Sequence, residues 1–280
     1  MDEVNKISVL TITRDRTSHL KNLLEGLARS SRLPDNCVVV HMNEPAKPLG
    51  DWPFECHHCR YDGGDVVLPL AHARNFAAQN ATGDLLLFLD VDCIPGAALV
   101  EEYERACVRS PAAITMGAVR YLPNKVDLDW SDTTEAFLRS QSKPNAKRDI
   151  SNLTQPSLES NYGLFWSLSF ALHRSVFDRI GGFSEGYPGY GAEDTDFAWK
   201  ARAQSVPLLW VPQAIAYHQY HHSTVPPWRH FHSIVHNARV FYQRWNEWPM
   251  DSWLKVFADE GYIEWSLEGD RIEVLRSPSV

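Results

Sequence analysis

Two aspartates separated by one residue have the clearest chemical meaning in this sequence. Asp90 and Asp92 follow the apolar run Leu85–Leu89, which is typical of a buried strand. Carboxylates at the end of such a strand are costly to bury unless a cation meets them. A divalent cation that also binds phosphate oxygens would do so. The pattern predicts a metal and diphosphate site at this strand end. The alternative is that the two acids merely end the strand.

A second acidic cluster follows about a hundred residues later. Glu193 and Asp194 come directly after the glycine-containing run 189–192. Glycines let a backbone turn sharply or approach a ligand closely. A carboxylate in such a place can take a proton from an attacking hydroxyl group. Helix capping is the alternative, because acids at a helix start are favoured by the helix dipole.

Histidines cluster after the last strand candidate. His218, His221 and His222 fall within five positions. A lone histidine in a strand is more often structural, but three histidines within five positions, in a chain that also has Asp92, indicate a metal site. We expect His218 to be the ligand, with His221 and His222 as the substitutes. The expected ion is Mn²⁺ or Mg²⁺, and an imidazole ligand favours Mn²⁺.

Strand and helix candidates alternate along the chain. This alternation predicts an α/β fold with a mostly parallel sheet flanked by helices. In such sheets ligands bind beyond the carboxyl ends of the strands, where Asp90 and Asp92 lie. The expected strands are 7–12, 37–41, 66–68, 85–89, 167–173, 208–211 and 214–218, and the expected helices are 20–29, 71–80, 97–109, 175–180 and 193–204.

Two segments depart from this alternation. Residues 124–160 are polar and lack a sustained period, which predicts a flexible loop that closes over a bound ligand. Residues 226–280 are rich in aromatics and look helical. We expect one domain over 1–225 and a C-terminal helical extension over 226–280 that packs on it. Peripheral membrane contact is the alternative role for this aromatic tail.

Taken in order, these motifs resemble the GT-A glycosyltransferases, whose fold is Rossmann-like. The resemblance is to family 2 enzymes and to the C-terminal motif region of the galactosyltransferase/N-acetylgalactosaminyltransferase groups. It is carried by Asp90-Val91-Asp92, Gly181-Gly182-Phe183, Gly189–Asp194 and His218. It implies a metal-dependent, inverting transfer of a hexose from a nucleotide-diphosphate sugar to a hydroxyl acceptor. A UDP-sugar is the favoured donor and a GDP-sugar the other option, with a glycan, glycolipid or small molecule as acceptor.

The resemblance also implies residue roles. Asp194 would be the catalytic base, which indicates inversion because retaining relatives usually have asparagine there. Glu193 would contact the acceptor. Asp92 would bind the metal, as would His218, six residues after Pro212. Trp166 is a candidate for stacking on the acceptor sugar, with core packing as the alternative. The residues expected to bind the nucleotide sugar are Thr13, Arg14, Asp15, Arg16, Arg74, Asp90 and Val91.

Two other functions fit parts of the pattern. A nucleotidyltransferase would need a glycine-rich phosphate loop, and Thr11–Arg16 contains no glycine. A non-catalytic carbohydrate-binding protein on the same fold need not keep both acidic clusters. A zinc site at Cys56–Cys59 is disfavoured, because adjacent residues rarely all reach one ion and no second Cys-X-X-Cys exists.

The composition limits which classes of partner and which cellular compartment we expect. The formal net charge of −8 argues against a nucleic-acid partner. The sequence contains no run of eighteen apolar residues, so we expect no transmembrane segment. The first residues do not resemble a signal peptide. The five cysteines are an odd number, and we interpret them as reduced thiols. These features predict a cytoplasmic protein.

Overall fold

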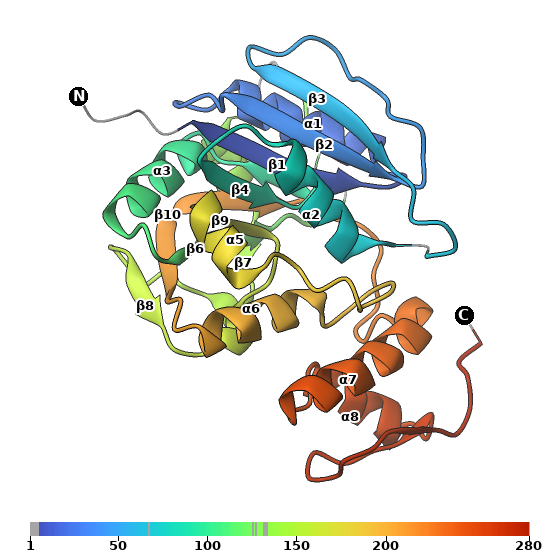
Figure 1. Cartoon of the computed structure of the whole chain (residues 1–280). Coiled ribbons are helices and arrows are strands. Elements are labelled where there is room, and N and C mark those ends of the chain that lie inside the picture. The colour runs from blue at the N-terminus through green and yellow to red at the C-terminus, as the bar shows by residue number, and fades with distance from the viewer. Residues whose placement is uncertain (1–5, 67, 125, 127, 131–133, 280) are drawn as a thin grey trace.

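The computed structural model describes residues 6–66, 68–124, 126, 128–130 and 134–279. A large twisted sheet forms its centre, with helices in front of it and behind it (Figure 1). The strands are β1 Ile7–Thr13, β2 Asn36–Met42, β3 Glu55–Tyr61, β4 Leu85–Leu89, β5 Cys93–Pro95, β6 Ile114–Tyr121, β7 Lys143–Pro144, β8 Ser157–Glu159, β9 Ser169–His173 and β10 Leu208–His218.

The main sheet has the order β3-β2-β1-β4-β9-β6-β10-β5. Strands β3, β2, β1 and β4 are mutually parallel, and β6 is parallel to β10. Strand β9 runs antiparallel to both β4 and β6, and β5 runs antiparallel to β10. The sheet is therefore mostly parallel, as expected, and the carboxyl ends of β1, β4, β6 and β10 meet at one edge.

Helices cover both faces of this sheet because side chains alternate along each strand. Leu86 and Phe88 of β4 pack into the core formed with α2, α5 and α6. Leu85, Leu87 and Leu89 pack into the opposite core, formed with α1 and α3. The helices are α1 Thr17–Ala28, α2 Leu70–Asn80, α3 Leu99–Arg109, α4 Glu135–Gln141, α5 Arg174–Ile180, α6 Glu193–Ala203, α7 Phe231–Trp245 and α8 Asp251–Asp259.

Two expectations about strands were wrong. The third strand is β3, Glu55–Tyr61, and not 66–68; residue 67 lies outside the described residues, and Val66 and Leu68 are in no strand. The two strands expected at 208–211 and 214–218 are one strand, β10, with a register shift between Val211 and Ile215.

The segment 124–160 is also more ordered than a loop. Besides α4, β7 and β8 it contains the 3₁₀ helix η1, Ala146–Arg148. The α4 helix begins at Thr134, whose side chain accepts a hydrogen bond from the Phe137 N–H. Residues 125, 127 and 131–133 of this segment lie outside the described residues.

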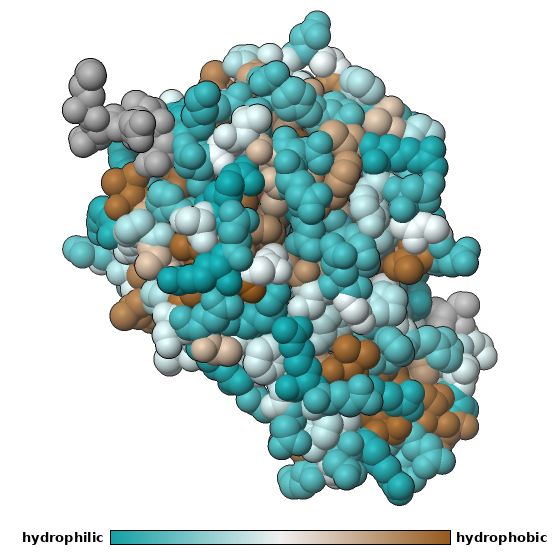
Figure 2. All heavy atoms as spheres, in the orientation of Figure 1, coloured by the Kyte–Doolittle hydropathy of each residue, from teal (hydrophilic) through white to brown (hydrophobic). Residues whose placement is uncertain are grey.

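The C-terminal residues form a small cluster of their own, visible in orange and red in Figure 1. Helices α7 and α8 and the hairpin β11 Ile263–Glu264 with β12 Glu273–Val274 surround an aromatic core. Hydrophobic atoms gather on the surface of this part in Figure 2, and Leu267 and Leu275 are exposed. None of the helices among the described residues has the length and apolar character needed to cross a membrane.

Candidate active site

Strand pairing brings the first acidic motif and the histidines together. In the β5–β10 pair Cys93 lies opposite His218, so Asp92 comes beside the end of β10. The Gln219 N–H donates to the Asp92 backbone carbonyl over 2.6 Å, and this hydrogen bond joins the residue after β10 to the residue before β5. One ligand atom from each of Asp92, His218 and His221 lies within 4.8 Å of the other two. These three side chains could hold one metal ion.

Two buried polar atoms of this cluster have no hydrogen-bond partner among the described residues. Asp92 is 7% exposed, and its Oδ1 accepts no hydrogen bond from the described residues. Its nearest basic neighbours are Arg16 Nε at 3.9 Å from Oδ1, His19 Nε2 at 3.8 Å from Oδ1, and His221 Nε2 at 3.4 Å from Oδ2. The Nδ1 of His221 is also buried without a partner. A carboxylate and imidazoles left in this state fit a divalent cation.

The protonation of His218 agrees with this chemistry. Burial lowers the pKa of His218 to about 4, so its imidazole is neutral at pH 7. A neutral imidazole is the form that binds a metal. The ring stacks against Tyr121 with a centroid distance of 4.7 Å, which fixes its orientation. His222 is exposed and is not in the three-residue cluster.

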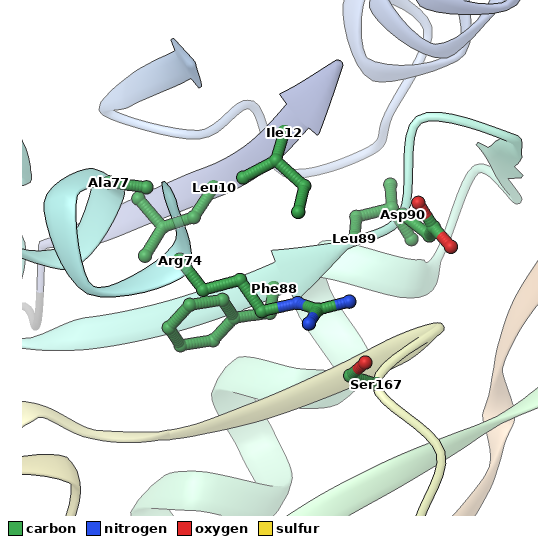
Figure 3. Close-up of a pocket in the computed structure, with 8 residues that line it drawn as sticks. All are labelled: Leu10, Ile12, Arg74, Ala77, Phe88, Leu89, Asp90 and Ser167. Carbon is green, nitrogen blue, oxygen red and sulfur yellow. The ribbon is translucent and has the colours of Figure 1, made fainter. Parts of the chain in front are cut away.

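Asp90, at the end of β4, lines a small pocket together with Arg74 and Ser167 (Figure 3). The Arg74 side chain extends from α2 along this pocket toward Ser167 and Asp90. Burial raises the pKa of Asp90 to about 7, and repulsion from Asp92 acts in the same direction. Val91 between the two aspartates is buried in the core with α1 and α3.

The second acidic cluster begins at a strained turn. Gly189, Gly191 and Ala192 all have positive φ, at +75°, +100° and +69°. The φ of Gly191 strains any other residue, and an added Cβ would also come within 2.8 Å of the Met250 sulfur, so glycine is favoured there. The Asn237 amide of α7 donates to the carbonyls of Pro188 and Gly191, at 3.0 and 2.8 Å. The C-terminal segment therefore holds the turn that delivers α6 to the site.

The first two residues of α6 face the pocket side of the sheet. Arg74 Nη1 donates to Glu193 Oε1 over 2.9 Å, and the second oxygen of Glu193 is buried without a partner. Asp194 Oδ1 accepts the Thr195 N–H over 2.7 Å. Burial raises the pKa of Asp194 to about 6, with repulsion from Glu193 as a second cause. Asp194 is thus ionised at pH 7 but close to the range in which it can accept a proton.

The loop after β1 lies beside the metal cluster through Arg16. Asp15 has a positive φ of 54°, and its N–H donates to Glu44 Oε2 over 2.9 Å. The Thr13 hydroxyl is buried without a hydrogen-bond partner among the described residues. Arg14 lies 3.7 Å from the Asp15 carboxylate. Sequence reasoning singled out this loop but missed Glu44, which holds it.

The side chains of Cys56–Cys59 do not converge on one point. They lie on β3, where successive side chains alternate between faces. His58 Nδ1 lies 3.0 Å from His41 Nε2, and His58 Nε2 lies 3.4 Å from Cys56 Sγ. The two ring nitrogens of His58 thus serve a hydrogen-bonded chain along β2 and β3 and do not share a ligand. Trp166, the candidate for stacking on the acceptor sugar, is half-buried, and its ring packs against the Arg148 guanidinium.

Sequence relatives are found among characterised glucosyltransferases. Validoxylamine A glucosyltransferase of Streptomyces hygroscopicus subsp. limoneus is 25% identical over 226 residues, which cover 72% of this chain and 49% of the relative. The protein of that name from subsp. jinggangensis (strain 5008) is 26% identical over 226 residues, with 72% and 52% covered. The chain thus spans about half the length of these curated relatives.

Solved structures share the fold at lower identity. GalNAc-T7, crystallised with UDP, GalNAc and Mn²⁺, is 16% identical with a TM-score of 0.56, over 79% of this chain and 45% of that one. Staphylococcus aureus TarS 1–349 in complex with UDP is 15% identical with a TM-score of 0.55, over 83% of this chain and 64% of that one. At these identities the likeness shows the GT-A fold alone.

A family model provides the remaining comparison. The model described as glycosyltransferase-like family 2 matches residues 55–244, well over half of the chain. The matched range contains both acidic clusters and the metal-ligand candidates His218 and His221. On this match, the chain belongs to the glycosyltransferase-like family 2.

Proposed function

We propose that this protein is a metal-dependent, inverting glycosyltransferase that moves a hexose from a nucleotide-diphosphate sugar to a hydroxyl group. A UDP-sugar is the favoured donor, and the acceptor is a glycan, a glycolipid or a small molecule. The observation that carries the proposal is the Asp92, His218 and His221 cluster, in which Asp92 Oδ1 and His221 Nδ1 are buried and have no hydrogen-bond partner among the described residues. This cluster lies at the edge of the sheet where β4 and β10 end.

The metal would be Mn²⁺ or Mg²⁺, held by Asp92, His218 and His221. Bound there, it would supply positive charge to the diphosphate as the nucleotide leaves. Both curated relatives are named as glucosyltransferases, and the GalNAc-T7 structure contains UDP and Mn²⁺. These likenesses support the choice of a hexose, of UDP and of Mn²⁺.

The chain's own residues supply the rest of the mechanism. Asp194 takes the proton of the acceptor hydroxyl, and that oxygen attacks the anomeric carbon on the face opposite the leaving group, so the product is inverted. Glu193 binds the acceptor through its unpartnered Oε2, while Arg74 holds Oε1 at 2.9 Å. The donor's nucleotide lies along Thr13–Arg16 and Asp90, beside Arg16 and the metal cluster.

The same contacts support a division of the chain into a domain and an extension. We propose that 1–225 is the catalytic domain and that 226–280 is an extension of it. Asn237 on α7 binds the turn before Glu193, which supports the view that the extension completes the site. A cytoplasmic location is part of this proposal, and peripheral membrane contact by the aromatic tail is the alternative to its packing on the domain.

A thermal-shift screen tests the function directly. UDP-, GDP- and TDP-sugars are added with Mn²⁺ or with EDTA, because a ligand that binds the native state raises Tm by mass action. We expect a UDP-sugar to raise Tm with Mn²⁺ and to lose this effect in EDTA. Hydrolysis of the stabilising donor, followed with and without Mn²⁺, then separates an enzyme from a binding protein. No stabilisation by any donor contradicts the proposal.

A further inference from the structure

Arg148 is a buried cation that forms no hydrogen bond with an anionic group among the described residues. It ends the 3₁₀ helix η1 and is 6% exposed. Its Nε, Nη1 and Nη2 are all buried, and none of them has a hydrogen-bond partner among the described residues. A guanidinium group carries five N–H donors and stays charged at any physiological pH. Leaving all of these donors unsatisfied in the interior is costly, which calls for an explanation.

Two tryptophans hold the guanidinium group in place. Its central carbon lies 5.0 Å from the ring centre of Trp166 and 4.9 Å from that of Trp210. Trp210 Nε1 donates to Glu159 Oε2 over 2.9 Å, which fixes that ring. Aromatic faces attract a cation but accept no N–H bonds in the plane of the guanidinium. The arginine is therefore oriented by the protein while its donors stay unused.

The neighbouring ionisable groups do not neutralise it. The groups that act on Arg148 electrostatically are Tyr121, Tyr103, Asp194 and Cys93. Burial raises the pKa of Tyr121 to about 12 and raises those of Tyr103 and Cys93 above their ordinary values, so all three are neutral at pH 7. Asp194 is the remaining anion of this set, and no hydrogen bond joins it to Arg148.

Arg148 is close to the active site through several elements. Strand β7, just before η1, pairs Lys143 with Tyr121 of β6, and Tyr121 lies opposite His218 of β10. On the other side, Trp166 directly precedes Ser167, whose backbone binds the Asp194 carboxylate. The same segment reaches Asp90, whose N–H donates to the Leu168 carbonyl over 2.8 Å.

We propose that Arg148 binds an oxyanion of a ligand in this active site, a phosphate or a carboxylate group. The planar fork of a guanidinium pairs with either group through two parallel hydrogen bonds. Two sources offer this chemistry: the diphosphate of the donor and an acidic group on the acceptor. The inference rests on the proposed function and adds to it a residue that sets ligand charge.

The test compares Arg148→Met with the matched control Lys147→Met, which removes the same charge from the exposed neighbouring residue. Calorimetry with Mn²⁺ measures the affinity for UDP and for uridine, which lacks the diphosphate. A second titration, with UDP present, measures glucuronate against glucose. Melting curves of the ligand-free proteins complete the set. Uridine binding reports that the site is still folded.

A donor contact predicts that Arg148→Met weakens UDP binding by about 10–100-fold, with uridine binding unchanged. An acceptor contact predicts unchanged UDP binding and a loss of that size for glucuronate but not for glucose. Lys147→Met should match wild type throughout. Ligand-free Arg148→Met should melt at or above the wild-type Tm, because an unpaired buried charge has been removed.

Three results overturn the inference. The first is wild-type affinity of Arg148→Met for both UDP and glucuronate, including the case where neither protein binds glucuronate. The second is a lowered Tm together with weakened uridine binding, which indicates a structural arginine. The third is that Lys147→Met weakens ligand binding as much as Arg148→Met does, which indicates a general charge effect. Wild-type protein that binds no UDP contradicts the proposed function instead, and the inference then falls with it.

Discussion

Two acidic regions of this protein are built from similar groups but differ in how completely their polar atoms are paired. At the sheet edge, Asp92 and His221 each keep a buried atom without a partner. At the junction of α6 and α7, Asp196 is fully buried and accepts hydrogen bonds from four side chains. The donors are Ser184 Oγ at 2.5 Å, Tyr187 Oη at 3.0 Å, Arg244 Nη1 at 3.0 Å and Trp245 Nε1 at 2.8 Å.

This difference separates ligand sites from structural joints. A buried carboxylate that the fold itself satisfies stabilises the fold. One that the fold leaves unsatisfied lowers stability until a ligand arrives, which is typical of functional sites. Asp92 and Asp196 fall on opposite sides of this division, and Asp194, the proposed base, lies only two residues before Asp196 on the same helix. Mutations should therefore separate loss of activity from loss of stability.

The largest effect on activity is expected at Asp194. Asp194→Asn keeps the shape and the bond from the Thr195 N–H but cannot take a proton. Turnover of the donor identified by the thermal-shift screen should fall by about 10²–10⁴-fold, the usual contribution of a positioned base. Donor affinity should stay within a few-fold. Single-turnover kinetics and calorimetry measure the two quantities, and NMR of the product should show an inverted anomer. Near-normal turnover or a retained anomer means that the base lies elsewhere.

The opposite result is expected two residues later. Asp196→Asn leaves the donors of Ser184, Tyr187, Arg244 and Trp245 around a neutral amide. Because Arg244 is 42% exposed, water compensates part of the loss, and we expect the free energy of unfolding to fall by about 2–4 kcal/mol. Urea denaturation measures this change. If Asp196→Asn keeps its stability and loses activity, Asp196 is a functional and not a structural carboxylate.

The three neighbouring histidines should differ in how much each contributes to Mn²⁺ binding. His218→Ala and His221→Ala should each weaken Mn²⁺ binding by about 10–100-fold, with His218→Ala the more severe because its ring is held by Tyr121. His222→Ala is the matched control, since that side chain is exposed. Direct titration with Mn²⁺ in the presence of UDP ranks the variants. If His222→Ala is the worst of the three, the ligand assignment is wrong.

The smallest expected effect is a change of rate with pH. Burial raises the pKa of Asp194 to about 6, and its charged neighbours are Glu193 and Arg74. The base acts when ionised, so turnover should be level above pH 7 and fall about tenfold for each pH unit well below 6. Asp194→Asn should lack this acid limb. A wild-type profile with no change near pH 6 argues against Asp194 as the base.

The same pKa predicts a change in stability of defined sign. A carboxyl group whose pKa is raised by folding binds its proton more tightly in the folded state. Its contribution to stability is therefore complete below its unfolded pKa and is lost as pH rises through about 6. Asp194→Asn should then be at least as stable as wild type at pH 7.5, unlike Asp196→Asn. Urea denaturation at pH 5 and pH 7.5 measures both.

The central elements of the fold were predictable because their sequences match their environments. Strands β1, β2 and β4 are apolar runs buried on both faces, and α2 begins and ends within one residue of its expected bounds. Strand β3 was missed because Glu55–Tyr61 is polar and lies at the sheet edge, partly exposed. The three-residue strand β5 is too short to give any periodic signal.

The members of the candidate site could be chosen from the sequence where they belong to motifs, and not where their position depends on long-range packing. Asp92, His218 and Asp194 were identified from residue type and order. The sequence does not display that His221, three residues beyond the end of β10, also has a ligand atom within 4.8 Å of those of Asp92 and His218. Asn237 and Arg148 gave no local signal, because their roles come from a loop 46 residues away and from two distant tryptophans.

The most direct test of the account is the binding of UDP to wild-type protein and to Asp92→Asn, each titrated with Mn²⁺ and with EDTA. Asp92→Asn keeps the side-chain shape but removes the charge that the fold leaves unpaired. We predict that wild-type protein binds UDP tightly with Mn²⁺ and weakly in EDTA. The variant should bind weakly in both and should melt at or above the wild-type Tm without ligand. Equal UDP affinity of the two proteins with Mn²⁺, or no effect of EDTA on wild type, would contradict the metal site on which the account depends.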